Sequence, residues 1–507
     1  MTASSGDSVF RLSRLRFAAV ASFAVLNLAV FSLRLLSVWK YGSLFSTQSG
    51  EFLMIYSIWK GMRHLPVYEW PFAFPFSLSL YNYLFYEFYA AVLRMIGAWD
   101  AGIETWGRLL TSLFAFVGAF AQWRLIGNRL NLRGARSLLS FLFALGLWLS
   151  TSIVRYWALT IRPDLPAAAL VMAAFWMVLR PSRFNFALAG VFFYLAWSFK
   201  QSAVLTLAAV CLFLLFHKRW RDLSVLAGVF AVLSGATILL GTPEYRFSVL
   251  VAPRLIHSAF WFPVLWRALA HPLITNFYWM VAPLALLLAA GARRADRTVQ
   301  LTATVFAIAL LGGLAGMGTI GASDSYLLEA FVAGSTLFQI AVFTAPAGLV
   351  EALLLIGCLQ PALQLTMIPS GRSTFGTVQL ASPAEFANAV EVRDRLAQMK
   401  RPIFTTDQSF SLPWISTDDR APALIIDHFF SDATPGRAQN GGFRGMLQRG
   451  EVPTVILNTG SPYEKDLSPN YLKTGSFLHQ GVPYNQGVHY DIYTIGTPTP
   501  AADPPAK

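Results

Sequence analysis

Charged residues and cysteines are both scarce in this chain. Only 13% of its 507 residues are charged, which is about half the share that soluble domains carry. Its two cysteines, Cys211 and Cys358, lie in apolar segments and outside any CxxC pattern, which argues against a disulfide framework and against a cysteine zinc site. Because 55% of the residues are hydrophobic, we expect most of the chain to lie in a bilayer.

Acidic residues are fewer than basic ones. The chain has 26 Asp and Glu against 39 Lys and Arg, which gives a net charge of +13. In a soluble protein this balance would suggest a nucleic-acid partner. Here the basic residues fall mostly in short loops between apolar segments, and the sequence has no basic stripe and no nucleic-acid-binding motif. Membrane topology and anionic lipid headgroups explain the charge better.

Apolar segments long enough to cross a bilayer recur along the first 370 residues. They predict about eleven transmembrane helices. The first is expected to stay uncleaved, because no convincing small-residue cleavage site follows it. The predicted helices cover residues 17–38, 104–124, 136–154, 164–180, 184–200, 202–217, 222–241, 272–291, 299–317, 325–342 and 346–367.

The basic loops predict which side of the membrane each helix end faces. With a cytoplasmic N-terminus, four basic loops fall in the cytoplasm, as the positive-inside rule requires. These loops lie at 124–136, 180–183, 217–221 and 293–297. An odd number of helices then places the C-terminus outside. We therefore expect a multi-pass protein of the cytoplasmic (inner) membrane with an extracytoplasmic, or periplasmic, C-terminal domain.

Three regions are expected to lie outside the membrane, and one of them is a second outer loop over 242–271. The first outer loop, 39–103, is rich in Trp, Tyr, Phe and Pro, which predicts short amphipathic helices at the membrane surface. Beyond residue 370, a Ser382–Glu385 capping-box pattern opens an amphipathic helix through about Met399. Four short strands follow, within 401–407, 423–430, 453–458 and 488–496. The prediction is a transmembrane domain over 1–369, a small α/β domain over 370–496 and a disordered tail over 497–507.

Ionisable and polar groups in or beside membrane helices are functional candidates, because they are costly there. Most of those in this chain fall at outer helix ends or in outer loops, where they would line one outward-facing cavity. They are Glu51, Glu69, Asp164, Lys200, Gln201, Arg246, Arg254, His257, Asp324, Tyr326 and Glu329. The alternative for each residue alone is that it anchors its helix at the lipid headgroups.

Several of these residues have two interpretations. Glu51 could act as general base on an attacking hydroxyl, or it could be an N-terminal charge on the helix that follows it. Lys200 could bind a phosphate or extend to the headgroups. Arg162 and Asp164 could simply pair at a helix start. Arg246 and Arg254 could bind a phosphate or be solvated at the surface.

Two motif matches carry little weight. GMGTIG, Gly316 to Gly321, fits a dinucleotide-binding pattern but follows no soluble strand. Gly312 and Gly316 are better explained as sites of close helix approach. Asp427-His428 has no second ligand cluster, so no metal site is predicted, although a divalent cation, Mg or Mn, stays open as a cofactor.

The order of these features resembles that of the GT-C glycosyltransferases, polytopic membrane enzymes that use polyprenyl-phosphate sugars. Within them the chain is most similar to the branch of protein O-mannosyltransferases and aminoarabinose transferases. The resemblance covers about residues 15–367. The stretches that carry it are SGEFLMIYSIWKG, PVYEW, LYNYLFYEFYAAVLRMIG, WGRLLTSLFAFVGAFAQWRLIG, TIRPDLPAAALVMAAF, SFKQSAVL and GASDSYLLEAF.

The resemblance implies a catalytic carboxylate in the first outer loop. The family usually has an Asp-Glu pair there, whereas this chain has Gly50, Glu51 and Phe52, so the role of general base is carried to Glu51. Asp164, Lys200, Asp324, Tyr326 and Glu329 lie where family members have cavity and donor-phosphate residues. The full set predicted to bind donor phosphate or substrate is Arg162, Asp164, Lys200, Gln201, Arg246, Arg254, Tyr326, Glu329, Glu69 and Tyr81.

The implied activity moves a sugar from a polyprenyl-phosphate donor to a hydroxyl of a cell-envelope glycan, lipid or protein on the outer face of the membrane. One displacement would invert the anomeric carbon, since a retaining enzyme needs a second close carboxylate. Two other functions stay open. The chain could be a lipid or glycan transporter or flippase, although it shows no pseudo-repeat. It could also be an inactive binding protein that kept the fold.

Overall fold

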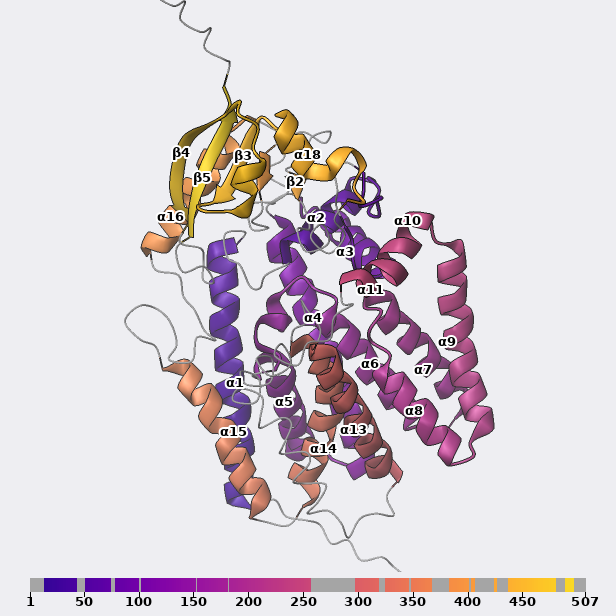
Figure 1. Ribbon diagram of the computed structural model, residues 1–507. Coiled ribbons are helices and arrows are strands. Elements are labelled where there is room, and N and C mark those ends of the chain that lie inside the picture. Colours follow the sequence, from indigo (N-terminus) through magenta and orange to yellow (C-terminus); the bar gives the residue numbers. More distant parts are fainter. Residues whose placement is uncertain are drawn as a thin grey trace, which may run out of the picture.

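The computed structural model is a bundle of helices with a small sheet at one end (Figure 1). We call this end of the bundle the sheet end and the opposite one the far end. The residues that the structure describes are 13–42, 51–73, 78–99, 102–151, 153–180, 182–256, 297–318, 324–345, 348–366, 383–400, 403–405, 424–425, 436–479 and 488–496.

Ten of the predicted membrane helices are confirmed as helices, and the remaining one, 272–291, lies outside the described residues. Five of them are long and apolar enough to cross a membrane: α1, α4, α9, α13 and the helix ending in α14. The bounds are α1 (Arg14–Tyr41), α4 (Gly102–Leu130), α5 (Gly134–Ser150), α6 (Asp164–Val178), α7 (Arg183–Phe199), α8 (Leu205–Phe216), α9 (Trp220–Leu240), α13 (Arg297–Met317), α14 (Leu328–Thr344) and α15 (Leu349–Leu365).

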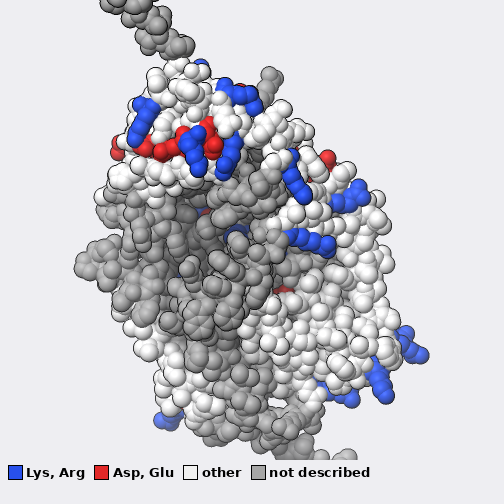
Figure 2. All heavy atoms as spheres, viewed as in Figure 1, with Lys and Arg blue, Asp and Glu red and all other residues white. Residues whose placement is uncertain are grey.

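The surface of the bundle is that of a membrane protein. The most apolar stretch of α9 is only 11% buried within the protein, and Leu239 and Leu240 at its end are 78% and 87% exposed. Figure 2 shows Lys and Arg side chains near the two ends of the molecule, with a band between them in which the described surface is almost uncharged. Such a band fits the hydrocarbon core of a bilayer.

Glycines bring helices close together in the bundle, as predicted for Gly312 and Gly316. A Cβ on Gly312 would lie 2.6 Å from Leu205 of α8. A Cβ on Gly316 would lie 2.6 Å from the ring of Tyr326, in the short helix η5 (Asp324–Leu327) that leads into α14. This part of the GMGTIG motif therefore serves packing, while residues 319–321 lie outside the described part of the chain.

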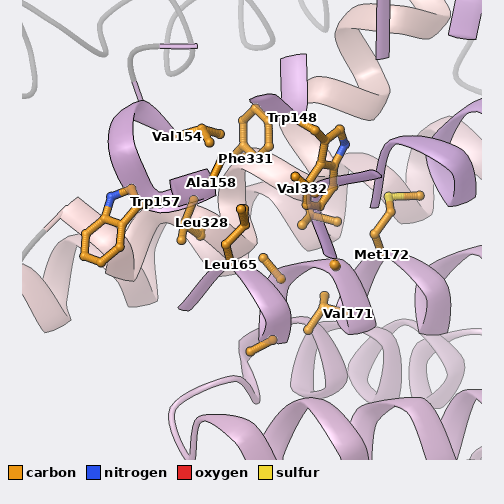
Figure 3. Close-up of a cluster of buried hydrophobic side chains, with 14 of the residues drawn as sticks. Trp148, Val154, Trp157, Ala158, Leu165, Val171, Met172, Leu328, Phe331 and Val332 are labelled. Atoms are coloured by element: carbon orange, nitrogen blue, oxygen red, sulfur yellow. The ribbon is translucent and has the colours of Figure 1, made fainter. Parts of the chain in front are cut away.

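A buried apolar cluster fixes the segment before α6. Figure 3 shows side chains from α5, from the short helix η2 (Arg155–Leu159), from α6 and from α14 meeting in one core. The rings of Trp148 and Phe331 lie 5.4 Å apart, and the indole of Trp148 donates to Gln122 Oε1 over 2.8 Å. Because this core is closely packed, η2 and the residues that follow it are held in place.

The first loop forms two short helices, α2 (Glu51–Met62) and α3 (Tyr83–Met95), as predicted. α3 buries one face, with Phe85, Tyr86, Tyr89, Ala90 and Leu93 inward. α2 differs from the predicted surface helix, because all of its residues except Leu53 are buried. Other parts of the chain cover α2 on every side, and a local sequence pattern does not reveal this.

The C-terminal sheet has the strand order β2-β1-β3-β5-β4. β1 is parallel to β2 and β3, and β5 is antiparallel to β3 and β4. The predicted helix and four predicted strands are confirmed within the described residues, whereas β4 and α18 were not predicted. The bounds are α16 (Pro383–Ala397), β1 (Ile403–Thr405), β2 (Leu424–Ile425), α18 (Gly442–Arg449), β3 (Thr454–Asn458), β4 (Tyr471–His479) and β5 (Val488–Ile495). Ser382, Asp427 and His428 lie outside the described residues.

Candidate functional site

Two cations share one buried carboxylate near the sheet end of the bundle. Asp164 is the first residue of α6, and Lys200 directly follows the last residue of α7. Lys200 Nζ lies 2.6 Å from Asp164 Oδ1, and Arg162 Nε lies 3.1 Å from Asp164 Oδ2. The Asp164 side chain is fully buried, while Lys200 and Arg162 are 11% and 16% exposed. Two positive charges against one negative charge leave these three residues with an excess of one positive charge.

Aromatic and hydroxyl groups surround Arg162, Asp164 and Lys200, which we call the Lys200 cluster. Arg162 Nη2 donates to Tyr81 Oη over 2.6 Å, and Lys200 Nζ lies 3.4 Å from Ser325 Oγ. Lys200 also lies 5.0 Å from the ring centroid of Tyr326. Burial raises the pKa of the Tyr81 hydroxyl, so that hydroxyl keeps its proton. The structure thus brings together five residues predicted from the sequence, namely Tyr81, Arg162, Asp164, Lys200 and Tyr326.

Two other predicted residues support this cluster through backbone contacts. Glu329 accepts hydrogen bonds from the backbone N–H groups of Thr206 (2.7 Å) and Leu205 (3.4 Å). It therefore caps the first turn of α8, whose N–H groups have no partner within the helix. Gln201 donates to the carbonyl of Leu80 over 2.6 Å, which ties the first loop to the residue after Lys200.

Glu69 belongs to a separate ion pair in the first loop. Its Oε2 lies 2.9 Å from Lys60 Nζ, and the Glu69 side chain is 26% exposed while that of Lys60 is 3% exposed. Burial lowers the pKa of Lys60, and the charge of Glu69 opposes this effect. Lys60 was not among the predicted site residues.

Glu51 lies in a second buried ion pair. Its two carboxylate oxygens accept hydrogen bonds from Arg108 Nε (3.0 Å) and Nη2 (2.6 Å). Glu51 Oε1 also accepts one from the backbone N–H of Ile161 over 2.8 Å, and both side chains are fully buried. Arg108 Nη1 donates in turn to the carbonyl of Gly42 over 3.0 Å. We call this arrangement the Glu51–Arg108 clasp.

The clasp connects four parts of the chain: the residue after α1, the start of α2, the body of α4 and the segment before α6. Ile161 directly precedes Arg162, so the clasp holds the backbone from which the Lys200 cluster is built. The sequence prediction missed Arg108. A usable signal was present, because an arginine within an apolar membrane helix is by default a functional candidate.

The remaining predicted residues are not part of these clusters. Arg246 and Arg254 are exposed on the helical segment after α9, and within the described residues neither side chain forms a hydrogen bond or ion pair. His257 and the side chain of Asp324 lie outside what the structure describes. No group of three His, Cys, Asp or Glu side chains in the described ranges is arranged to hold a metal ion, and a requirement for Mg or Mn stays a prediction.

No protein-family model matches the chain, and no curated protein sequence matches it significantly. Solved structures do match. ArnT from Cupriavidus metallidurans, bound to undecaprenyl phosphate, superposes with a TM-score of 0.57 at 12% identity, over 94% of this chain and 98% of ArnT. Its apo state gives the same values. The archaeal oligosaccharyltransferase AglB from Archaeoglobus fulgidus, in complex with an inhibitory peptide and a dolichol-phosphate, gives 0.52 at 10% identity, over 87% of this chain and 69% of AglB.

The chain has the GT-C fold. The predicted fold class, a multi-pass helical membrane protein with a small C-terminal sheet domain, is thereby confirmed. At 10% and 12% identity, the likeness concerns the course of the chain. What a protein of this fold does must be argued from its own residues.

Proposed function

We propose that this chain is a membrane glycosyltransferase that takes a sugar from a polyprenyl phosphate and transfers it to a hydroxyl of a cell-envelope glycan, lipid or protein. Two proteins of the same fold have been solved with a polyprenyl-type lipid phosphate bound, undecaprenyl phosphate in ArnT and a dolichol-phosphate in AglB. A ligand of this class needs a cationic group for its phosphate, and the Lys200 cluster provides one.

The observation that carries the proposal is the pairing of Lys200 and Arg162 around the single carboxylate of Asp164. An ammonium has three N–H donors, and within the described residues Lys200 directs one to Asp164 and one to Ser325. A third is left for a phosphate oxygen. Among the described residues the Tyr81 hydroxyl accepts a hydrogen bond from Arg162, and its own proton can be donated to the phosphate as well.

In the proposed reaction, the acceptor oxygen attacks the anomeric carbon of the sugar as the bond from that carbon to the phosphate oxygen breaks. The electron pair of the broken bond stays on the phosphate, where Lys200 and Arg162 stabilise the added charge. One such displacement inverts the anomeric centre. The acceptor proton passes to a general base, and Glu51 is the carboxylate that we propose for this role.

Glu51 can act as base only after its carboxylate releases at least one of its present donors. Hydrogen bonds from two donors of Arg108 and from the backbone N–H of Ile161, all within the described residues, hold its oxygens in a fully buried position. The proposal therefore requires that donor and acceptor binding opens the clasp.

The same observation favours a second candidate function. If the clasp stays closed, the chain binds a lipid phosphate at the Lys200 cluster without transferring a sugar. The two functions differ in one respect, since both require lipid-phosphate binding and only the first yields a glycosylated product.

We further propose that the sheet end faces away from the cytoplasm and the N-terminus lies within it. The positive-inside rule supports this orientation, because the basic turn between α8 and α9 lies at the far end (Figure 1). The membrane proposed is the cytoplasmic one.

A transfer assay in membranes tests the proposal. Membranes containing the protein are incubated with a panel of radiolabelled polyprenyl-phosphate sugars, and product is measured for the wild type, Glu51→Gln and Lys473→Gln. Lys473 is a matched control, because it pairs with Asp491 over 2.7 Å in the sheet domain. We expect transfer with one donor, its loss in Glu51→Gln and its retention in Lys473→Gln. Transfer by Glu51→Gln at the wild-type rate would remove Glu51 as the base.

A further inference from the structure

The segment after α9 is an amphipathic helix that changes its winding in the middle. It consists of α10 (Pro243–Arg246), a π-helical turn η3 (Phe247–Val251) and α11 (Ala252–Ile256). Its buried residues include Tyr245, Ser248, Val249 and Ala252, and its exposed residues include Arg246, Leu250, Val251 and Arg254.

Arg246, Leu250 and Arg254 recur every fourth residue, so they lie along one face of the helix. We call this face, with the adjoining Val251, the interface face. Leu250 and Val251 are 38% and 42% exposed. The turn η3 is π-helical, with i→i+5 hydrogen bonds. Such turns are rare in proteins and are often found at functional sites.

The opposite face fastens the segment to the first loop. Tyr245 Oη donates to Asn82 Oδ1 over 2.6 Å, and the ring of Tyr245 lies 5.1 Å from that of Tyr68 and 6.1 Å from that of Tyr83. Because one face is fixed in this way, the interface face cannot turn inward without breaking these contacts. Its exposure is a property of the fold.

The position of the segment relative to lipid follows from α9. Leu226 is the only residue of α9 that is buried, so the helix presents apolar side chains to lipid around most of its surface. It ends at Leu240, and α10 begins at Pro243. The segment therefore begins where a membrane helix leaves the hydrocarbon core, which is the level of the headgroups. Figure 2 shows Lys and Arg side chains at the edge of the molecule where α10 and α11 lie.

We propose that the interface face lies on the bilayer surface and binds the phosphates of lipid headgroups. Its two guanidinium groups face phosphate oxygens, which they can bind bidentately, and Leu250 and Val251 lie among the first carbons of the acyl chains. Charge complementarity supports this occupant, since Glu244 is the one carboxylate in the segment and is only partly exposed. Continuity with the lipid-facing surface of α9 supports it as well.

This assignment gives Arg246 and Arg254 a role distinct from donor binding. When the interface face is bound to the headgroups, it holds the first loop, which carries Tyr81, at a fixed height on the membrane. This anchoring role does not depend on sugar transfer, and it holds for either function proposed above.

The first test measures how lipids stabilise the purified full-length protein. The midpoint of thermal unfolding is followed in detergent while phosphatidylglycerol, phosphatidylcholine or inorganic phosphate is added. We expect phosphatidylglycerol to raise the midpoint most. The variant Arg246→Gln/Arg254→Gln should need about fivefold more of this lipid for each arginine removed to reach the same increase. The control Arg393→Gln/Arg449→Gln removes two exposed arginines of the sheet domain and should respond like the wild type.

Two results of this titration would overturn the proposal. One is an equal response to phosphatidylglycerol in the wild type and the Arg246/Arg254 double variant. The other is equal stabilisation of the wild type by inorganic phosphate alone, which would indicate a site for a free anion.

A second test locates the interface face without altering its arginines. Val251→Cys, in a chain with Cys211 and Cys358 replaced by Ala, is labelled with an environment-sensitive fluorophore and reconstituted into phosphatidylglycerol vesicles. We expect blue-shifted emission that nitroxide lipids labelled near the headgroup quench. The control is Thr459→Cys, an exposed position in the sheet domain, which should emit as in water. Emission from Val251→Cys that matches this control would contradict the proposal.

Discussion

Two buried ion pairs inside this protein each join side chains that lie far apart in the chain. Glu51 and Arg108 are 57 positions apart, and Asp164 and Lys200 are 36 apart. The types of these residues could be predicted as functional, because a charge in an apolar segment needs a reason. Their partners could not, since pairing depends on how α2, α4, α6 and α7 come together in space.

The clasp gives the first prediction at this scale. Arg108→Met should strongly destabilise the protein, because removing one partner of a buried pair leaves the Glu51 charge uncompensated, at about 3–5 kcal/mol. Unfolding in detergent, followed by tryptophan fluorescence, measures this effect. The double variant Glu51→Leu/Arg108→Met should recover part of the lost stability, because it removes both charges. Equal stability of Arg108→Met and the wild type would show that the clasp contributes nothing.

At the scale of elements, the helices of the bundle were predictable and the smaller elements only in part. Long apolar segments mark α1, α4, α9 and α13 because a bilayer requires that length. β4 was missed because Gly475 interrupts its pattern, where the pairing with β5 is irregular. The full burial of α2 was missed because it arises from the elements that surround it.

Helix contacts at glycine give the second prediction. A Cβ on Gly313 would lie 2.7 Å from the backbone carbonyl oxygen of Tyr326, so Gly313→Ala should push α13 away from η5. Overpacking of this kind costs about 1–3 kcal/mol and should lower the unfolding midpoint.

Gly228→Ala provides the matched control, because a Cβ there would meet nothing within 4 Å and α9 gains a better helix former. Its midpoint should stay level or rise. Equal midpoints for the two variants would refute the close contact between α13 and η5.

At the scale of the whole molecule, the proposed orientation can be tested in cells. In a chain without Cys211 and Cys358, a cysteine replaces either Thr459 at the sheet end or Arg221 in the first turn of α9 at the far end, both exposed. A membrane-impermeant maleimide should label Thr459→Cys in cells whose outer barrier is opened. It should reach Arg221→Cys only after the membrane is lysed. The reverse pattern would invert the proposed topology.

The central claim is that the Lys200 cluster binds the phosphate of a polyprenyl lipid, and its most direct test is an affinity measurement. Purified wild-type protein, Lys200→Gln, Lys200→Arg and the control Lys473→Gln are titrated with undecaprenyl phosphate. A hydrogen bond to a charged group contributes about 1.5–3 kcal/mol, so Lys200→Gln should bind at least about tenfold more weakly. Lys200→Arg keeps the charge and should retain most of the affinity, and Lys473→Gln should bind like the wild type. Wild-type affinity in Lys200→Gln would contradict the account.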